Sequence, residues 1–305
     1  MSCGRPPLEI CKGINDLERV ILRGPRSSSV EILLYGGQVI SWKNADGEEL
    51  LFLSTKTTFK PPKPIRGGIP ICFPVFSEHG CVEQQAFARN RLWSVDSATP
   101  PFGANPTDKT LFIDLILRSS KEHMKIWPHN FELRLRIALG STGNLMMTCR
   151  VRNTNTDGKP FAFTFALRNH FRVSDVGEVR IEGLETLYYL DNLQEKELFT
   201  DQGDAVSFDS EVDKVYINTP SKIAVIDHGK RQTVVIRKDT GLPDVGVWNP
   251  WEKKAKEMCD FEDEEYEEMV CVEPAVVEKP ITLKPGEEWK GRQELSFVPS
   301  SYCSD

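Results

Sequence analysis

Hydrophobic and polar residues alternate along much of this chain, and a period of two is typical of β-strands. The alternating or wholly apolar stretches are residues 30–42, 110–120, 131–140, 145–154 and 161–171. Glycine, asparagine, aspartate and proline separate them, as expected for turns. Few stretches keep the spacing of an amphipathic helix. The pattern therefore predicts an all-β protein, and a β-sandwich in preference to an α/β sheet.

The composition fits a protein with a large hydrophobic core. The chain has 305 residues, of which 39% are hydrophobic, and no repeat or linker divides it. We therefore expect residues 1–305 to form one domain. The net charge of −7 argues against nucleic acid or an anionic membrane as the main partner. Any site for an anion must then be local.

The eight cysteines predict free thiols, without a metal site or cofactor. They are Cys3, Cys11, Cys72, Cys81, Cys149, Cys259, Cys271 and Cys303. They form no C-x-x-C pair and no zinc spacing with histidine. The N-terminus lacks the apolar run of a signal peptide, and no segment is typical of a membrane span. We expect a cytoplasmic protein with reduced cysteines, and a monomer by default.

Cationic, aromatic and acidic residues gather in a few segments that are distant in sequence. These segments are residues 66–76, 83–93, 247–254 and 270–274. Arg66 and Arg89 are forked cations that suit an anionic group, and the face of Trp248 can stack on a sugar ring. Glu273 follows an apolar, strand-like run, where a carboxylate is costly unless it is used. Together these residues predict a sugar-phosphate site.

The acidic run at 260–268 needs no functional role. It follows the basic segment 252–256. Blocks of like charge are usually solvated, so we expect a charged surface loop or a short helix there.

Seven strings, in this order, resemble those of plant-type glucose-6-phosphate 1-epimerases, the hexose-6-phosphate mutarotases of the aldose 1-epimerase superfamily. The number and order of the strings carry the resemblance, which runs almost from end to end. They are YGGQVISWK (35–43), RGGIPICFPVF (66–76), FARNRLW (87–93), LYYLDNLQ (187–194), SEVDKVY (210–216), LPDVGVWNPWEKK (242–254) and KPITLKPGEEW (279–289).

The resemblance implies a galactose mutarotase-like β-supersandwich with a concave binding face. It also implies interconversion of the α and β anomers of a hexose 6-phosphate, with glucose 6-phosphate as the expected substrate. Residue by residue, Arg66 and Arg89 match arginines that hold the phosphate, and Gln84 matches a glutamine that contacts the sugar. Asp213 matches a carboxylate that binds sugar hydroxyls, and Glu273 matches the general base.

Two positions depart from the family pattern, because Gln85 and Arg168 stand where members usually have histidine. A histidine can give and regain a proton near neutral pH, whereas a guanidinium stays protonated. Arg168 can still donate a hydrogen bond to the ring oxygen or stabilise charge there. His170 points to the same face of a strand as Arg168, and we predict it as a substitute acid. His79 is a second candidate.

Three classes of function are compatible with these residues. The first is an epimerase. The second is a catalytically impaired protein that binds a sugar phosphate, because both family histidines are replaced. The third is an interaction scaffold, which has no need of Arg66 and Arg89. We favour the epimerase.

Overall fold

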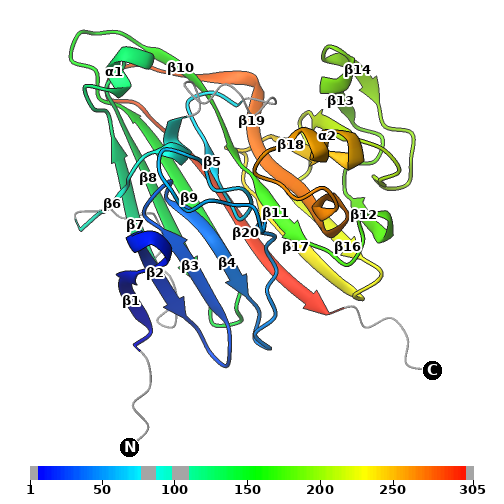
Figure 1. The fold of residues 1–305 in the computed structure, drawn as a ribbon. Helices are drawn as coiled ribbons and strands as arrows, with labels where there is room; N and C mark the ends of the chain where they lie inside the picture. Colours follow the sequence, from blue (N-terminus) through cyan, green and yellow to red (C-terminus); the bar gives the residue numbers. More distant parts are fainter. Residues whose placement is uncertain (1–5, 77–86, 98–109, 300–305) are drawn as a thin grey trace, which may run out of the picture.

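The computed structural model describes residues 6–76, 87–97 and 110–299, and antiparallel β-strands dominate it (Figure 1). The predicted all-β class is confirmed. The strands form three sheets. The first sheet has the order β1 (Leu8–Lys12), β2 (Glu18–Arg23), β3 (Ser29–Leu33) and β4 (Gln38–Lys43).

The second sheet carries the candidate site. Its order is β14 (Glu197–Thr200), β13 (Tyr188–Asp191), β15 (Val212–Tyr216), β18 (Asp244–Asn249), β19 (Met269–Leu283), β10 (Phe161–Leu167) and β5 (Ile71–Cys72), and β11 (Asn169–Arg172) also pairs with β19. The third sheet has the order β12 (Val179–Glu182), β16 (Lys222–Asp227), β17 (Gln232–Lys238), β20 (Glu288–Pro299), β9 (Leu145–Asn153), β8 (Phe131–Leu139), β7 (Leu111–Arg118) and β6 (Ser94–Val95).

Helices are short and lie in the connections. They are the α-helices α1 (His123–Ile126) and α2 (Trp251–Glu257), and the 3-10 helices η1 (Ile14–Asp16), η2 (Phe87–Asn90), η3 (Val176–Glu178), η4 (Asn192–Gln194) and η5 (Glu265–Glu268). Within the described ranges no helix is long and apolar enough to cross a membrane. The acidic run at 260–268 forms a turn followed by η5, as predicted.

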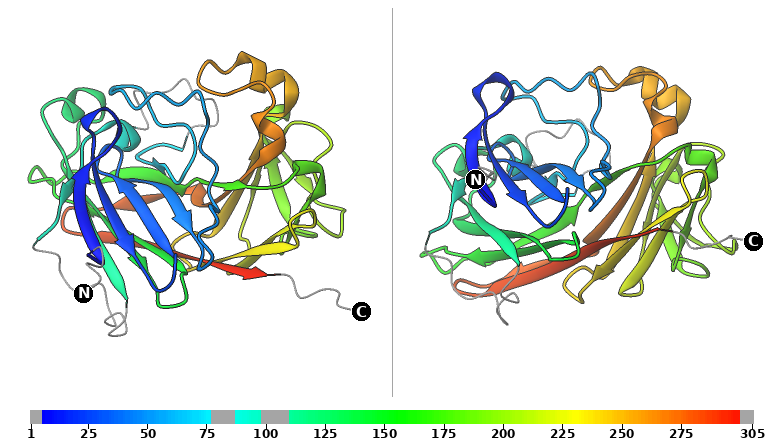
Figure 2. Two further views of the ribbon diagram at one scale, coloured as in Figure 1. Left: turned by 60° about the horizontal axis from the view of Figure 1, so that its bottom comes forward. Right: turned by 90° about the horizontal axis from the view of Figure 1, so that it is seen from below.

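The second and third sheets pack face to face, and Figure 2 shows their long strands β19 and β20 crossing the molecule in separate layers. Phe163 and Phe165 of β10 place their rings 5.5 and 5.0 Å from the ring of Trp289 in β20. The first sheet lies beside β6 to β9 (Figure 2). Trp42 Nε1 of β4 donates to the carbonyl of Gly143, in the turn between β8 and β9, at 2.8 Å. One hydrophobic core therefore joins all three sheets.

Two buried amides connect the layers behind the candidate site. Asn169 Nδ2 donates to Gln293 Oε1 at 3.0 Å, and Gln293 Nε2 returns a hydrogen bond to Asn169 Oδ1 at 2.8 Å. Both residues have no exposed surface. Because side chains alternate along an extended chain, the inward position of Asn169 directs Arg168 and His170 to the opposite face of the sheet.

The predicted strand at 30–42 is two strands, because Gly36 and Gly37 turn the chain with positive φ values of 82° and 58°. A side chain at Gly36 is excluded by contact, since its Cβ would lie 2.7 Å from the carbonyl oxygen of Arg89. The amide of Gly36 also donates to the carbonyl of Arg91 at 2.7 Å. This turn therefore fixes the segment that carries Arg89.

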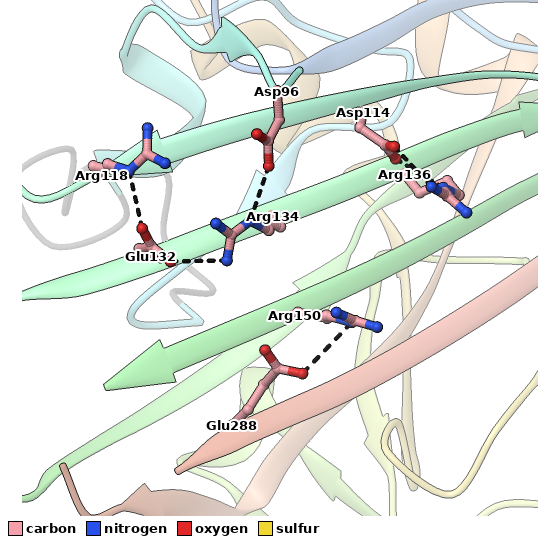
Figure 3. A network of polar contacts seen from close by, with 8 residues as sticks. All are labelled: Asp96, Asp114, Arg118, Glu132, Arg134, Arg136, Arg150 and Glu288. Atoms are coloured by element: carbon pink, nitrogen blue, oxygen red, sulfur yellow. Dashed lines mark hydrogen bonds and ion pairs between the residues drawn. The ribbon is translucent and has the colours of Figure 1, made fainter. Parts of the chain in front are cut away.

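The face of the third sheet that points away from the core carries a ladder of ion pairs (Figure 3). Arg136 holds Asp114 with two hydrogen bonds of 2.8 and 2.7 Å. The other pairs are Arg134 with Asp96 and Glu132, Arg118 with Glu132, and Arg150 with Glu288. Carboxylates partner all of these arginines.

Candidate active site

Glu273 and Arg168 face each other across two neighbouring strands. Asn169 of β11 pairs with Val272 of β19, so the preceding Arg168 lies opposite the following Glu273. Arg168 Nε is 2.8 Å from Glu273 Oε1, and the two side chains are 9% and 1% exposed. Burial alone lowers the pKa of Arg168, but the carboxylate of Glu273 and the nearby thiols raise it above its ordinary value. Arg168 is therefore a fixed positive charge.

The two oxygens of Glu273 have different surroundings. Oε1 lies beside Arg168 and accepts a hydrogen bond from the thiol of Cys271, whose Sγ is 3.3 Å away. Oε2 is buried and has no hydrogen-bond partner among the described residues. One oxygen is thus held by the protein, and the other has no hydrogen-bond partner within the described ranges.

Gly246 of β18 gives the Glu273 side chain its space. The two residues are paired in the sheet. A Cβ at Gly246 would lie 3.3 Å from Cβ and 3.5 Å from Cδ of Glu273. The carboxylate therefore lies against a bare stretch of backbone, which a larger residue would crowd.

His170 is buried with 1% of its surface exposed. Its Nδ1 is 3.0 Å from the carbonyl oxygen of Gly68, which can only accept, so Nδ1 carries the hydrogen and Nε2 carries a lone pair. Burial, followed by the charge of Arg168, lowers the pKa of His170 to about 3. The imidazole is therefore neutral at pH 7.

A row of four residues crosses the second sheet beside Glu273. Asp213 pairs with Trp248, Trp248 with Cys271, and Cys271 with His170. Paired residues point to the same face, so these four side chains share the face of Glu273. The rings of Trp248 and His170 meet edge to face at 6.4 Å. Asn192 Nδ2 donates to Asp213 Oδ1 at 2.7 Å and orients that carboxylate.

Arg66 approaches this face from the loop that precedes β5. Its Nε and Nη2 donate to the two carboxylate oxygens of Asp260, at 3.1 and 3.2 Å. The hydroxyl of Thr57 accepts from the Arg66 amide and donates to its carbonyl, both at 3.0 Å. The positive charge of Arg66 contributes to the lowered pKa of His170, so the two residues are near each other.

Arg89 reaches the site from η2. Burial raises the pKa of the Cys72 thiol, while the charges of Arg168 and Arg89 oppose this shift and Glu273 adds to it. Three of the predicted site residues therefore lie around Cys72. The structure thus brings Arg66, Arg89, Arg168 and Glu273 to one region.

Some sequence predictions fall outside the described residues. Gln84, Gln85 and His79 belong to the segment 77–86, so the roles predicted for them stay predictions. The roles predicted for the other site residues also stay predictions, although their positions are now known. Cys11, Cys72, Cys149, Cys259 and Cys271 are free thiols. In the described ranges no three histidine, cysteine, aspartate or glutamate side chains form a group that could hold a metal ion.

Sequence reasoning missed three residues of the site. Asp260 lies in the acidic run for which the sequence predicts a solvated segment, and nothing in the sequence signals its ion pair with Arg66. The sequence predicts Cys271 only as a free thiol, although its place two residues before Glu273 in a strand puts both side chains on one face. Gly246 could have been noticed as a glycine within a strand, which often marks a close approach.

Comparison with known proteins adds an independent observation. A family model described as aldose 1-epimerase matches residues 18–296. A protein of Cenchrus ciliaris, "Putative glucose-6-phosphate 1-epimerase", is 64% identical over 299 residues, which cover 98% of this chain and 90% of the relative. A protein of Salmonella typhimurium with the same name is 30% identical over 270 residues, which cover 88% of this chain and 86% of the relative.

Solved structures agree with the fold. The structure of a "putative mutarotase" from Salmonella typhimurium superposes with a TM-score of 0.83 at 26% identity, covering 98% of this chain and 96% of that one. A galactose mutarotase-like protein from Clostridium acetobutylicum has a TM-score of 0.72 at 17% identity, with coverage of 96% and 99%. The predicted galactose mutarotase-like β-supersandwich is confirmed.

Proposed function

The chain belongs to the aldose 1-epimerase family, and we propose that it interconverts the α and β anomers of a hexose 6-phosphate, in particular glucose 6-phosphate. The observation that carries this proposal is the state of Glu273. Its Oε2 is buried without a hydrogen-bond donor among the described residues, while Oε1 lies 2.8 Å from the cation of Arg168. Such an oxygen is suited to accept a proton from a bound hydroxyl.

A single group that accepts and then donates a proton is enough to balance the protons of this reaction. Opening the hemiacetal removes the proton from the anomeric hydroxyl, breaks the bond between C1 and the ring oxygen, and places a proton on the ring oxygen. The anomeric hydroxyl oxygen and the ring oxygen of the sugar are both bonded to C1. Glu273 can therefore take the proton from the anomeric hydroxyl and give it to the ring oxygen. After rotation of the aldehyde, the same steps in reverse close the ring on the other face. Glu273 acts as base and then as acid.

Arg168 supplies charge in this scheme. Negative charge develops on the ring oxygen as the bond to C1 breaks, and an oriented cation stabilises it without giving up a proton. The buried setting strengthens this interaction because the local dielectric is low. Arg168 would therefore stabilise the transition state of ring opening and keep Glu273 in place.

The role of His170 as a substitute acid stays a prediction, and it requires a protonated Nε2. Burial and the charge of Arg168 lower its pKa to about 3, which opposes protonation at neutral pH. The route through Glu273 does not need a protonated imidazole.

The phosphate would be held by Arg66 and Arg89, whose forked cations favour oxyanions. Arg66 would share its charge between the phosphate and Asp260, which it contacts with two hydrogen bonds. Asp213, oriented by Asn192, would accept hydrogen bonds from sugar hydroxyls.

A second candidate function is sugar-phosphate binding without turnover. It is favoured by the ion pair of Arg168 with Glu273, because a guanidinium cannot deliver a proton to the ring oxygen. Under this alternative the protein binds the same hexose 6-phosphate but does not catalyse the exchange of its anomers.

The deciding experiment is exchange NMR that resolves the two anomers of glucose 6-phosphate, with and without the protein. We expect exchange well above the uncatalysed background. Background exchange together with calorimetric binding would select the binding protein. Background exchange without binding of any hexose 6-phosphate would refute both functions.

A further inference from the structure

Two of the buried acceptor atoms that lack a hydrogen-bond donor within residues 6–76, 87–97 and 110–299 belong to the face of Glu273. They are Nε2 of His170 and Oε2 of Glu273. His170 pairs with Cys271, and Cys271 precedes Glu273 by two residues on the same strand, so both acceptors belong to one face. Buried acceptors are costly when they are unpaired, which points to a ligand that brings hydroxyl donors.

The hydrogen-bond role of His170 is fixed by the backbone beneath it. Gly68 accepts from both the amide and Nδ1 of His170, each at 3.0 Å. The position of Gly68 is itself constrained, since its φ is 62° and a Cβ there would lie 2.2 Å from the carbonyl oxygen of Val39. Because this carbonyl is held in place, the imidazole keeps its hydrogen on Nδ1 and presents Nε2 as an acceptor.

The described donors next to His170 do not hydrogen-bond to its Nε2. The thiol of Cys271 donates to Glu273 Oε1, and Arg168 forms its ion pair with the same oxygen. The ring of Trp248 meets His170 at a centroid distance of 6.4 Å. No described side chain therefore satisfies Nε2.

We propose that His170 determines specificity for the sugar, because its Nε2 accepts a hydrogen bond from one ring hydroxyl other than the anomeric one. This inference rests on the proposed function for the identity of the ligand, a hexose 6-phosphate. The neutral imidazole thus recognises a hydroxyl and takes no part in proton transfer. An analogue that lacks this hydroxyl leaves a buried acceptor unpaired, and such sites discriminate strongly.

The test pairs a change in the ligand with a change in the protein. Calorimetry measures the Kd of glucose 6-phosphate and its 2-, 3- and 4-deoxy analogues for the native protein, His170→Phe and His170→Gln. We expect one analogue to bind about tenfold or more weaker than glucose 6-phosphate to the native protein. For His170→Phe, glucose 6-phosphate and this deoxy analogue should bind with equal affinity. His170→Gln keeps an acceptor oxygen and should retain part of the difference.

A second measurement observes ligand binding to the native protein directly. NMR of the chain labelled with ¹⁵N-histidine follows the two ring nitrogens of His170, which are assigned by their loss in His170→Gln. We expect glucose 6-phosphate to shift Nε2 while Nδ1 keeps its hydrogen, and the critical deoxy analogue to leave Nε2 unshifted. A ring that carries hydrogen on both nitrogens in the complex would overturn the inference.

The outcomes separate this inference from the proposed function. If the protein catalyses anomer exchange but every deoxy analogue loses the same affinity, in native protein and in His170→Phe alike, the role of His170 is overturned and the proposed function is left intact. Discrimination that depends on His170, without any exchange, supports the inference in a protein that only binds. Failure of all hexose 6-phosphates to bind overturns both.

Discussion

Arg168 and Glu273 are distant in sequence, yet Nε of one lies 2.8 Å from Oε1 of the other inside the site. The pair combines a carboxylate that can move a proton with a cation that cannot. Charge stabilisation and proton transfer are thus assigned to different side chains, and each can be removed separately.

Replacing the carboxylate tests the proton-transfer role. Glu273→Gln keeps the shape of the side chain but cannot accept the proton, so we expect the exchange rate to fall by about 10²–10⁴-fold. The change also leaves Arg168 buried without its partner, which costs on the order of 3–5 kcal/mol of stability. Thermal unfolding must therefore accompany exchange NMR. Glu268→Gln, in an exposed ion pair with Arg172, is the matched control and should keep the native rate.

Replacing the guanidinium tests the charge role. We expect Arg168→Ala to lower the exchange rate by about 10²–10³-fold, the loss found when an oriented donor to a developing negative charge is removed. Arg168→His, alone or with Gln85→His, should recover part of this loss because it introduces a titratable imidazole. A rate for Arg168→His above that of the native protein would show that the native chain is impaired, as the binding function requires.

The phosphate site can be tested by comparing two ligands. Arg89→Ala should weaken glucose 6-phosphate by roughly 10- to 150-fold, which corresponds to about 1.5–3 kcal/mol for a charge-assisted hydrogen bond. Free glucose should bind with unchanged affinity. Arg118→Ala removes an arginine from the ion-pair ladder and serves as the control. Equal losses for both ligands in calorimetric titration would contradict the assignment of Arg89 to the phosphate.

The lowered pKa of His170 makes stability depend on pH. In the folded chain the pKa is about 3, whereas an unfolded histidine titrates near 6.5. Below pH 6.5 the unfolded state therefore binds a proton that the folded state does not, and stability falls by up to about 1.4 kcal/mol for each pH unit until about pH 3.

Urea unfolding at several pH values between 7 and 5 tests whether the free energy of unfolding falls as the pH is lowered. The pKa values of His123 and His129 are also lowered, mainly by burial, so they add to the native slope. The difference between native protein and His170→Phe isolates the share of His170, and the variant should lose less stability on acidification. Identical slopes would show that His170 is not held neutral.

The amide pair between the two layers predicts a non-additive result. Asn169→Leu or Gln293→Leu leaves one buried amide without its partner, so each should cost about 1–3 kcal/mol of unfolding free energy. The double variant should cost clearly less than the sum of the two single changes, as expected for residues in contact. Additive losses in urea titration would show that the two amides do not depend on each other.

Sequence patterns predicted the strands because alternation reflects which face of a strand is buried, a local property. Glu273 was found in the same way, as a carboxylate at the end of an apolar run. The partners of the site residues could not be predicted from local patterns. Arg66 contacts Asp260, and Arg168 contacts Glu273, only once the chain has folded and distant segments lie side by side. The glycine pair at 36 and 37 carried a turn signal within the run 30–42, and the surrounding alternation concealed it.

The pairing of β11 with β19 has a consequence for synthesis and refolding. Arg66, Arg89 and Arg168 all precede β19, so a chain still on the ribosome presents its cationic residues long before Glu273 is made. Such long-range strand pairing forms slowly, because a large loop must close first. Affinity for the complete ligand should then be among the last native properties to appear when the unfolded chain is diluted from denaturant. Ligand binding would in this way report the completion of folding.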